Sequence, residues 1–281
     1  MPEVRAVSGR RGALYLRRSR LTYKAALITG GAVRLGRAMA LGLAARGTSV
    51  AVHYAGSIDA AEATVGELKT AGVQAVALQA DLLDEAQMAD VVDRAVDGLG
   101  QPLDVLINNA SIFEHDDIRT ATKESWDRHI NSNLRAPFVL TQAFACQVPE
   151  VLTDAAGELL APAAIINMVD QRVRKPTPEF MTYTIAKMGL WAFTRTSARA
   201  LAPQVRVNAI GPGPTLQGHR QSAEHFAGQR QATVLQRGAD PAGIVAAMNY
   251  LLDAPAVTGQ LICVDGGQHL AWETPDVLCV E

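Results

Sequence analysis

A tyrosine and a lysine one helical turn apart are the residues of this chain best placed to move a proton. Tyr183 and Lys187 stand in YTIAK, at the start of an apolar run with helical periodicity. This spacing places both side chains on one helix face. A free tyrosine has a pKa of about 10, so a neighbouring cation that stabilises the phenolate makes it a usable acid or base. The pair predicts proton transfer to or from a substrate atom.

A glycine-rich turn upstream indicates a phosphate site. TGGAVRLG, from Thr29 to Gly36, follows the apolar segment AALIT. Gly30 permits a tight turn, and a helix beginning near Leu35 directs its amino end at the bound charge. Arg34 adds a cation where a glycine is often found. The turn predicts a dinucleotide site, and the alternative is a plain connection between a strand and a helix.

The end of the second apolar segment favours NADP over NAD. NAD-binding chains usually carry an acid there, which would repel a 2′-phosphate. VAVHYAGS instead offers His53, Tyr54 and Ser57, and no acid occurs before Asp59. We therefore expect these residues to bind NADPH, with Ser57 and a nearby basic residue as donors to the phosphate.

Two further segments extend the expected cofactor site. Asp81 and Leu82 follow VALQA and are placed to meet the adenine. NNAS supplies Asn109, Ala110 and Ser111 beside the ribose and nicotinamide. Asparagine and serine also favour turns that end a strand, but their position between the glycine turn and YTIAK favours a role in binding.

The elements that must position these residues alternate along the chain. Apolar strand patterns alternate with helical patterns, and such alternation predicts a single-domain, Rossmann-type, doubly wound parallel sheet of about seven strands with helices on both faces. The expected strands are 25–29, 49–54, 73–79, 103–108, 163–169, 205–210 and 260–264. The expected helices are 34–47, 59–72, 84–100, 126–148, 183–202 and 240–255.

Composition limits the classes of function. With 281 residues, 48% of them hydrophobic, the chain can bury a sizeable core, and residues 24–281 are expected to form one domain. A net charge of -2 gives no reason to expect nucleic acid or a membrane as partner. Three cysteines without ligand-like spacing predict no metal site and a reducing, cytoplasmic location.

Three segments depart from the alternation of strands and helices. Residues 1–23 are rich in arginine and are expected to form a flexible extension, with a basic tail, a targeting segment or an extended start as the possibilities. Residues 148–163 read as a surface loop or a subunit contact. The stretch near 212–238 leaves a strand through Pro212 and Gly213 and is expected to form a substrate loop at the carboxyl edge of the sheet.

Taken together, these motifs resemble the short-chain dehydrogenase/reductase family over about residues 24–272. The resemblance implies that Tyr183 and Lys187 are catalytic and lie beside the cofactor. It also implies that Asn133, in NSNLRAPF, holds a water on a proton relay. Pro212 and Gly213, in RVNAIGPG, would lie at the cofactor, and the family is commonly tetrameric, so a homotetramer is expected.

Within that family the chain resembles pteridine reductases. The shared features are TGxxxRLG with Arg34, HY followed by Ser57, NNASxF ending at Phe113, and INMVD with Asp170 where most relatives have serine. The resemblance implies that Phe113 stacks on a pterin and that Arg34 and Ser111 contact the substrate. Asp170 and Tyr183 would share proton delivery, and a carboxyl group suits a C=N nitrogen better than a carbonyl oxygen.

Departures from the pteridine reductase pattern leave alternatives open. Ala55 and Gly56 replace an arginine-bearing turn, so the preference for NADPH could be weaker, and no motif in 215–236 matches a pterin side chain. Dihydromonapterin, dihydrobiopterin, dihydrofolate and non-pterin imines or ketones all remain as small-molecule substrates. A short-chain ketone reductase is one alternative function. A non-catalytic NADP-binding sensor or structural subunit is another.

Overall fold

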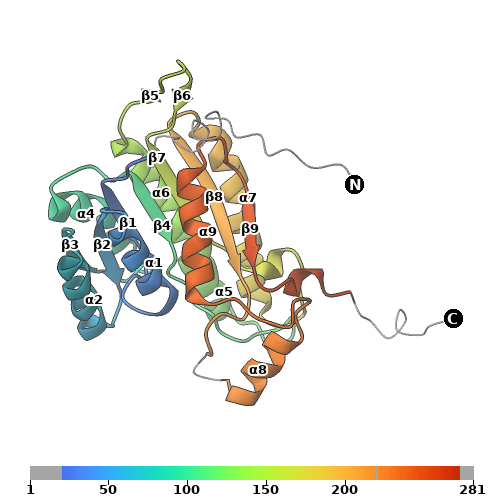
Figure 1. Ribbon diagram of the computed structural model, residues 1–281. Helices are drawn as coiled ribbons and strands as arrows, with labels where there is room; N and C mark the ends of the chain where they lie inside the picture. Colours follow the sequence, from blue (N-terminus) through green and yellow to red (C-terminus); the bar gives the residue numbers. More distant parts are fainter. Residues whose placement is uncertain (1–20, 219–220, 273–281) are drawn as a thin grey trace, which may run out of the picture.

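A seven-stranded parallel sheet lies between two helical layers in the computed structural model, which describes residues 21–218 and 221–272 (Figure 1). The strand order is β3-β2-β1-β4-β7-β8-β9, so the chain winds outward in both directions from β1 and the doubly wound fold is confirmed. The strands are β1 (Ala25–Ile28), β2 (Ser49–Tyr54), β3 (Ala75–Gln79), β4 (Val105–Asn108), β7 (Ala163–Met168), β8 (Val205–Pro212) and β9 (Leu261–Val264).

Alternate residues of the buried strands pack against different helical layers. Ala26 and Ile28 face the layer made by α1 (Arg34–Ala44), α2 (Ile58–Thr70) and α9 (Pro241–Asp253). Ala25 and Leu27 face α4 (Val91–Leu99), α6 (Ala136–Gln147) and α7 (Met181–Ala200). Because both faces are covered, the strands are apolar throughout, as their sequences indicate.

The helical stretches are more divided than their sequence patterns predict. The segment expected at 84–100 splits into α3 (Glu85–Ala89) and α4, and the segment expected at 126–148 forms α5 (Lys123–Ile130), the π-helical turn η1 (Asn131–Arg135) and α6. The expected substrate loop contains a helix, α8 (Ala223–Gln231), whose start is capped by Ser222. Within the described ranges, no helix is long and apolar enough to cross a membrane.

The expected loop at 148–163 is instead a small hairpin. β5 (Leu152–Thr153) pairs antiparallel with β6 (Leu159–Leu160). The Asp154 carboxylate accepts hydrogen bonds from the N–H groups of Ala156 and Glu158, and Gly157 adopts a positive φ of 84°. This turn chemistry closes the hairpin.

The amino-terminal boundary also differs from the expected one. Residues 1–20 of the expected extension lie outside the described residues, but Tyr23, its last residue, is buried in the core. The Tyr23 hydroxyl donates to the carbonyl of Leu252 and accepts a hydrogen bond from Arg206 at 2.8 Å. The packed domain therefore begins before residue 24.

Candidate active site

The carboxyl ends of the central strands open onto a cavity of about 690 Å³, a size typical of small-molecule sites. Most of the residues that the sequence assigns to cofactor and substrate line it. These are Gly30, Arg34, Leu35, Gly36, Asn109, Ala110, Ser111, Phe113, Asp170, Tyr183, Pro212 and Gly213. Segments far apart in the chain therefore meet at one edge of the sheet, where ligands of doubly wound folds bind.

Asp170 and Tyr183 form a hydrogen-bonded pair on the wall of this cavity. Asp170 follows β7 and begins the short helix η2 (Gln171–Val173), where its Oδ1 accepts the N–H of Arg172 at 2.8 Å. Its Oδ2 accepts the Tyr183 hydroxyl at 2.9 Å. The turn at η2 aims the carboxylate at the start of α7, so two proton-bearing groups face one substrate volume.

Burial, aided by the Asp170 carboxylate, keeps the Tyr183 hydroxyl protonated. Burial raises the pKa of Tyr183 well above its ordinary value, and the Asp170 carboxylate adds to the effect, with Arg172 and Ser111 opposing it. Burial also raises the pKa of Asp170. The expectation that Lys187, together with an oxidised nicotinamide, stabilises the phenolate stays a prediction. At neutral pH the Tyr183 hydroxyl therefore holds its proton, as a proton donor must.

Lys187 lies near the Tyr183 ring and binds the end of β7. Its Nζ donates to the carbonyl of Met168 at 2.8 Å and lies 5.7 Å from the centre of the Tyr183 ring. Burial lowers the pKa of Lys187 to about 8, although the Asp170 carboxylate opposes this. Its catalytic role stays a prediction. The spacing correctly places it on the same side of α7 as Tyr183.

Asn133 is fully buried within η1 and holds the loop that follows β4. Its Oδ1 accepts the N–H of Ile112 at 2.9 Å, and its Nδ2 donates to the carbonyl of Ile112 at 2.8 Å. Both ends of the amide are thus engaged with the residue before Phe113. The water relay stays a prediction.

The glycine turn has the shape and the donors that a pyrophosphate needs. Gly30 adopts a φ of +59°, and the Asn109 amide donates to the carbonyls of Thr29 and Gly30 at 2.9 and 3.0 Å. A Cβ on Gly36 would lie 2.0 Å from the Gly30 carbonyl oxygen, so only glycine lets α1 approach the turn. Val33 provides no side-chain cap and the first turn holds no acid, which leaves this helix end suited to an anion.

His53 lies under the glycine turn and outside the cavity wall. Its Nδ1 accepts the N–H of Gly30 at 3.1 Å, and its Nε2 lies 3.0 Å from the carbonyl of Ala80, so the proton resides on Nε2. Burial lowers the pKa of His53 to about 4. Any contribution to cofactor binding, which stays a prediction, would act through the position of Gly30.

The residues expected at the adenosine end lie along the ends of β2 and β3. Ser57 is exposed at the start of α2 and its side chain makes no capping bond. Tyr54 and Leu82 are buried, whereas Asp81 is exposed and its carboxylate accepts the N–H of Leu83. Their cofactor contacts remain predictions.

Arg34 connects the glycine turn to the loop after β8. Its guanidinium donates to the carbonyls of Leu216 and Gln217 at 3.1 and 3.0 Å, and its φ is +53°. This conformation is rare for residues with a side chain. The structure therefore brings Arg34 together with the expected substrate loop, which its sequence position alone could not reveal.

Sequence reasoning missed an aromatic neighbour of Phe113. The ring of Phe113 stacks on that of Phe180 at 4.2 Å with an angle of 8°, and meets Tyr183 edge-on at 4.7 Å. The guanidinium of Arg172 lies 5.0 Å from the Phe180 ring. Phe180 directly precedes α7 with a positive φ of 56°. An aromatic residue just before YTIAK was the available signal.

Comparisons with known proteins agree with this geometry. A family model described as short chain dehydrogenase matches residues 24–227. Among curated proteins, a 3-oxoacyl-[acyl-carrier-protein] reductase FabG of Staphylococcus epidermidis is 32% identical over 252 residues, covering 88% of this chain and 99% of that protein.

Among solved structures, a FolM alternative dihydrofolate reductase 1 from Brucella suis, in complex with NADP, is 39% identical with a TM-score of 0.84, covering 91% of this chain and 99% of that one. A short-chain dehydrogenase/reductase from Serratia marcescens is 30% identical with a TM-score of 0.79, covering 89% of this chain and 99% of that one.

Proposed function

Because the chain belongs to the short-chain dehydrogenase family, we propose that it reduces a C=N bond of a pterin-like substrate, of the kind that converts a dihydropterin to a tetrahydropterin. The chain is an NADP-dependent oxidoreductase that acts on a small molecule. The observation that carries the finer proposal is the Tyr183 hydroxyl bonded to the Asp170 carboxylate at 2.9 Å, on the wall of a cavity that also holds Phe113.

NADPH, when bound, supplies the hydride. The glycine turn with Arg34 would hold its phosphates, Ser57 its 2′-phosphate, Asp81 and Leu82 its adenine, and Asn109, Ala110, Ser111 and Lys187 its ribose and nicotinamide side. The half-exposed ring of Phe113 offers a flat apolar surface for a planar heterocycle.

The residues of the chain would supply the proton that C=N reduction requires at nitrogen. Tyr183 holds its proton at Oη because its pKa is raised, and Asp170 lies within one hydrogen bond of it. As nitrogen gains the proton from this pair, the C=N bond becomes CH–NH. Asp170 supports a nitrogen substrate because a carboxyl group can donate to an unprotonated ring nitrogen and, once ionised, accept from a ring N–H.

Reduction of a 3-oxoacyl ketone is the second candidate, favoured by curated relatives named FabG at 31–32% identity. Following NADPH absorbance with dihydropterins, dihydrofolate and 3-oxoacyl thioesters, and repeating the assay with NADH, separates the two. We expect kcat/KM for a dihydropterin to exceed that for the ketones by about tenfold or more. A ketone turned over faster than every pterin would overturn the proposal.

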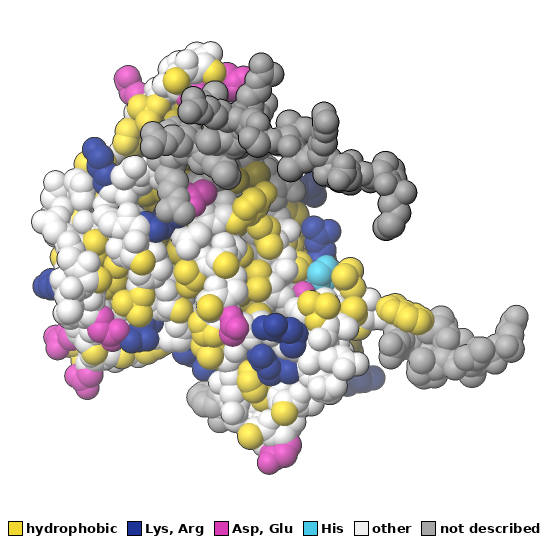
Figure 2. Space-filling view, viewed as in Figure 1, with side chains coloured by type: hydrophobic (Ala, Val, Ile, Leu, Met, Phe, Trp, Pro, Cys, Tyr) yellow, Lys and Arg dark blue, Asp and Glu magenta, His cyan; other side chains and the backbone are white. Residues whose placement is uncertain are grey.

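We also propose a cytoplasmic homotetramer. Exposed apolar side chains lie on two sides of the molecule, an arrangement that supports two different two-fold interfaces. Trp126, Phe138, Ile185 and Met188 lie on α5, α6 and α7. Tyr250, Leu270 and Trp272 lie on the side of α9 and β9, where Figure 2 shows exposed hydrophobic side chains. Free thiols at Cys146 and Cys263 support a reducing compartment.

A further inference from the structure

The backbone around Phe113 is held from both sides by one helical stretch. Asn133 binds both peptide groups of Ile112, as described above. On the other side, the N–H of Glu114 donates to Nε2 of His129 at 3.1 Å, and Arg128 binds the Glu114 carboxylate at 2.9 Å. The residues on both sides of Phe113 are therefore held in place, although the Phe113 ring itself is exposed.

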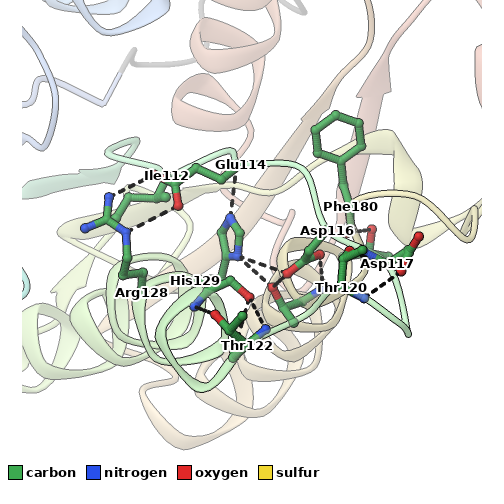
Figure 3. A network of polar contacts seen from close by, with 12 residues as sticks. Ile112, Glu114, Asp116, Asp117, Thr120, Thr122, Arg128, His129 and Phe180 are labelled. Carbon is green, nitrogen blue, oxygen red and sulfur yellow. Dashed lines mark hydrogen bonds and ion pairs between the residues drawn. The ribbon is translucent and has the colours of Figure 1, made fainter.

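His129 extends this support to α7 through a chain of buried hydrogen bonds. Because its Nε2 accepts a hydrogen bond from Glu114, the proton of the neutral ring lies on Nδ1, which donates to Oγ1 of Thr182 at 2.7 Å. The Thr182 hydroxyl then donates to Oδ2 of Asp116. His129, Thr182 and Asp116 are 0%, 2% and 2% exposed. Figure 3 shows the imidazole between Glu114 and Asp116.

The electrostatics agree with this direction of the hydrogen bonds. Burial lowers the pKa of His129, although the nearby Asp116 and Glu114 carboxylates oppose this, so the ring is neutral. Burial raises the pKa of Asp116, but hydrogen bonds from Thr182 and Ser125, with the nearby His129, together outweigh it, and the net shift is downward. A neutral His129 and a charged Asp116 fix the direction of each hydrogen bond from Glu114 through His129 and Thr182 to Asp116.

Asp116 also caps the helix that carries Tyr183. Phe180, at the start of α7, has no side chain that can cap it. The backbone carbonyl of Asp116 accepts the N–H of Met181 at 3.2 Å, and its Oδ1 accepts the N–H of Thr182 at 3.1 Å. A negative charge at this helix end is favourable. The same residue thus fixes the first turn of α7, just before Tyr183.

We propose that His129, Thr182 and Asp116 are positioning residues that set the Phe113 ring against the Tyr183 hydroxyl and so orient a planar substrate for protonation. They do not line the cavity and act only through the two residues that do. The proposal rests on the function proposed above, since it takes Phe113 as the substrate platform.

A matched pair of variants tests this link. Thr182→Val keeps the shape of the side chain and removes the hydroxyl, whereas Thr182→Ser keeps the hydroxyl. We expect Thr182→Val to lower kcat/KM for a dihydropterin by about tenfold and Thr182→Ser to stay within about threefold of wild type, with NADPH affinity unchanged in both. In the Phe113→Ala background, Thr182→Val should add less than about twofold, because both changes remove the same positioning.

A second variant and a spectroscopic measurement keep the proposal open to refutation. His129→Asn retains a donor towards Thr182 but loses the bond to Glu114, and should couple to Phe113→Ala in the same way even if Thr182→Val does not fold. Nitrogen-15 NMR of wild type should show His129 neutral with its proton on Nδ1. Equal kcat/KM for the valine and serine variants, additive effects with Phe113→Ala, or a proton on Nε2 would each overturn the link.

The wild-type assay separates this proposal from the proposed function. If wild type reduces dihydropterins and the variants behave as wild type, only the positioning link fails. If wild type reduces ketones alone, the proposed function fails. In that case, kcat/KM of the same variants with the ketone as substrate, together with the NMR measurement, still tests whether His129, Thr182 and Asp116 position Phe113.

Discussion

At the residue scale, the direction of one hydrogen bond shapes the chemistry. The Tyr183 hydroxyl donates to Asp170, and burial raises the pKa of both groups. Burial in the cavity therefore keeps the proton on Tyr183 at neutral pH until a substrate atom becomes basic enough to take it. Lys187, which the sequence places on the same face, donates to the Met168 carbonyl, and its catalytic role stays a prediction.

Removing the tyrosine hydroxyl tests proton donation directly. We expect Tyr183→Phe to lower kcat by about 10²–10⁴-fold, the range for loss of a general acid, while NADPH affinity stays within about threefold. Steady-state kinetics and a fluorescence titration with NADPH measure the two quantities. A comparable loss of NADPH affinity would contradict the role of Tyr183 as the proton donor.

Replacing the aspartate tests the preference for nitrogen. We expect Asp170→Ser to move the ratio of kcat/KM for C=N over C=O substrates towards ketones by about tenfold or more, because serine lacks an acidic proton for a ring nitrogen. Asp170→Asn, which keeps the size but not the charge, is the control and should lose pterin turnover without gaining ketone turnover. An unchanged ratio in the serine variant would remove the argument from the carboxylate.

At the element scale, His53 joins three pieces of the cofactor edge. It lies at the end of β2, binds the glycine turn after β1, and reaches the residue that follows β3. Its position at a strand end made it look like a cofactor contact. The tertiary structure gives both ring nitrogens backbone partners, and a contribution of His53 to cofactor binding through Gly30 stays a prediction.

The buried neutral state of His53 predicts a dependence of stability on pH. Its pKa is about 4 in the folded chain and 6.5 ordinarily, so the unfolded chain binds more protons between these values and stability falls as pH falls through this window. We expect this group to contribute a loss of about 3 kcal/mol. Asp104 acts oppositely, since burial raises its pKa to about 6. As pH falls, the folded chain therefore binds the Asp104 proton at a higher pH than the unfolded chain does.

Comparison of two chains isolates the histidine from Asp104. His53→Asn keeps an acceptor for the N–H of Gly30 but cannot ionise, whereas Asp104 is common to both proteins. Urea unfolding from neutral pH down to about 4 should give wild type the steeper loss of stability. Parallel curves for the two proteins would show that His53 does not remain neutral in the folded state.

The elements themselves were predicted with uneven success. The strands and most helices follow from apolar periodicity, because each buries a regular set of positions in the sheet or its covering layers. The hairpin at 152–160, the π-helical turn at Asn131–Arg135 and helix α8 were missed. Their short or weakly apolar segments carry little periodicity, so turn chemistry and tertiary contacts decide them.

At the scale of the whole molecule, the exposed apolar residues predict association. Ile185 and Met188 lie on the outer side of α7, and Phe138 of α6 contacts Phe193 beside them. We expect light scattering to give a tetramer for wild type and a smaller species for Met188→Glu, because a charge there would be buried without a partner. Lys69→Glu, at an exposed position of α2, is the control and should remain tetrameric. A monomeric wild type would contradict the proposal.

The sequence by itself determined the family, the sheet and most of the residues at its carboxyl edge. These depend on local patterns, because period and turn chemistry act between near neighbours and parallel strands bring their carboxyl ends to one edge. Only the tertiary structure decided that Asp170 accepts the Tyr183 hydroxyl, that Arg34 holds the loop after β8, and that His129 and Asp116 link Phe113 to α7. Such contacts join segments far apart in the chain. Their distances, burial and hydrogen-bond directions exist only once the chain has folded.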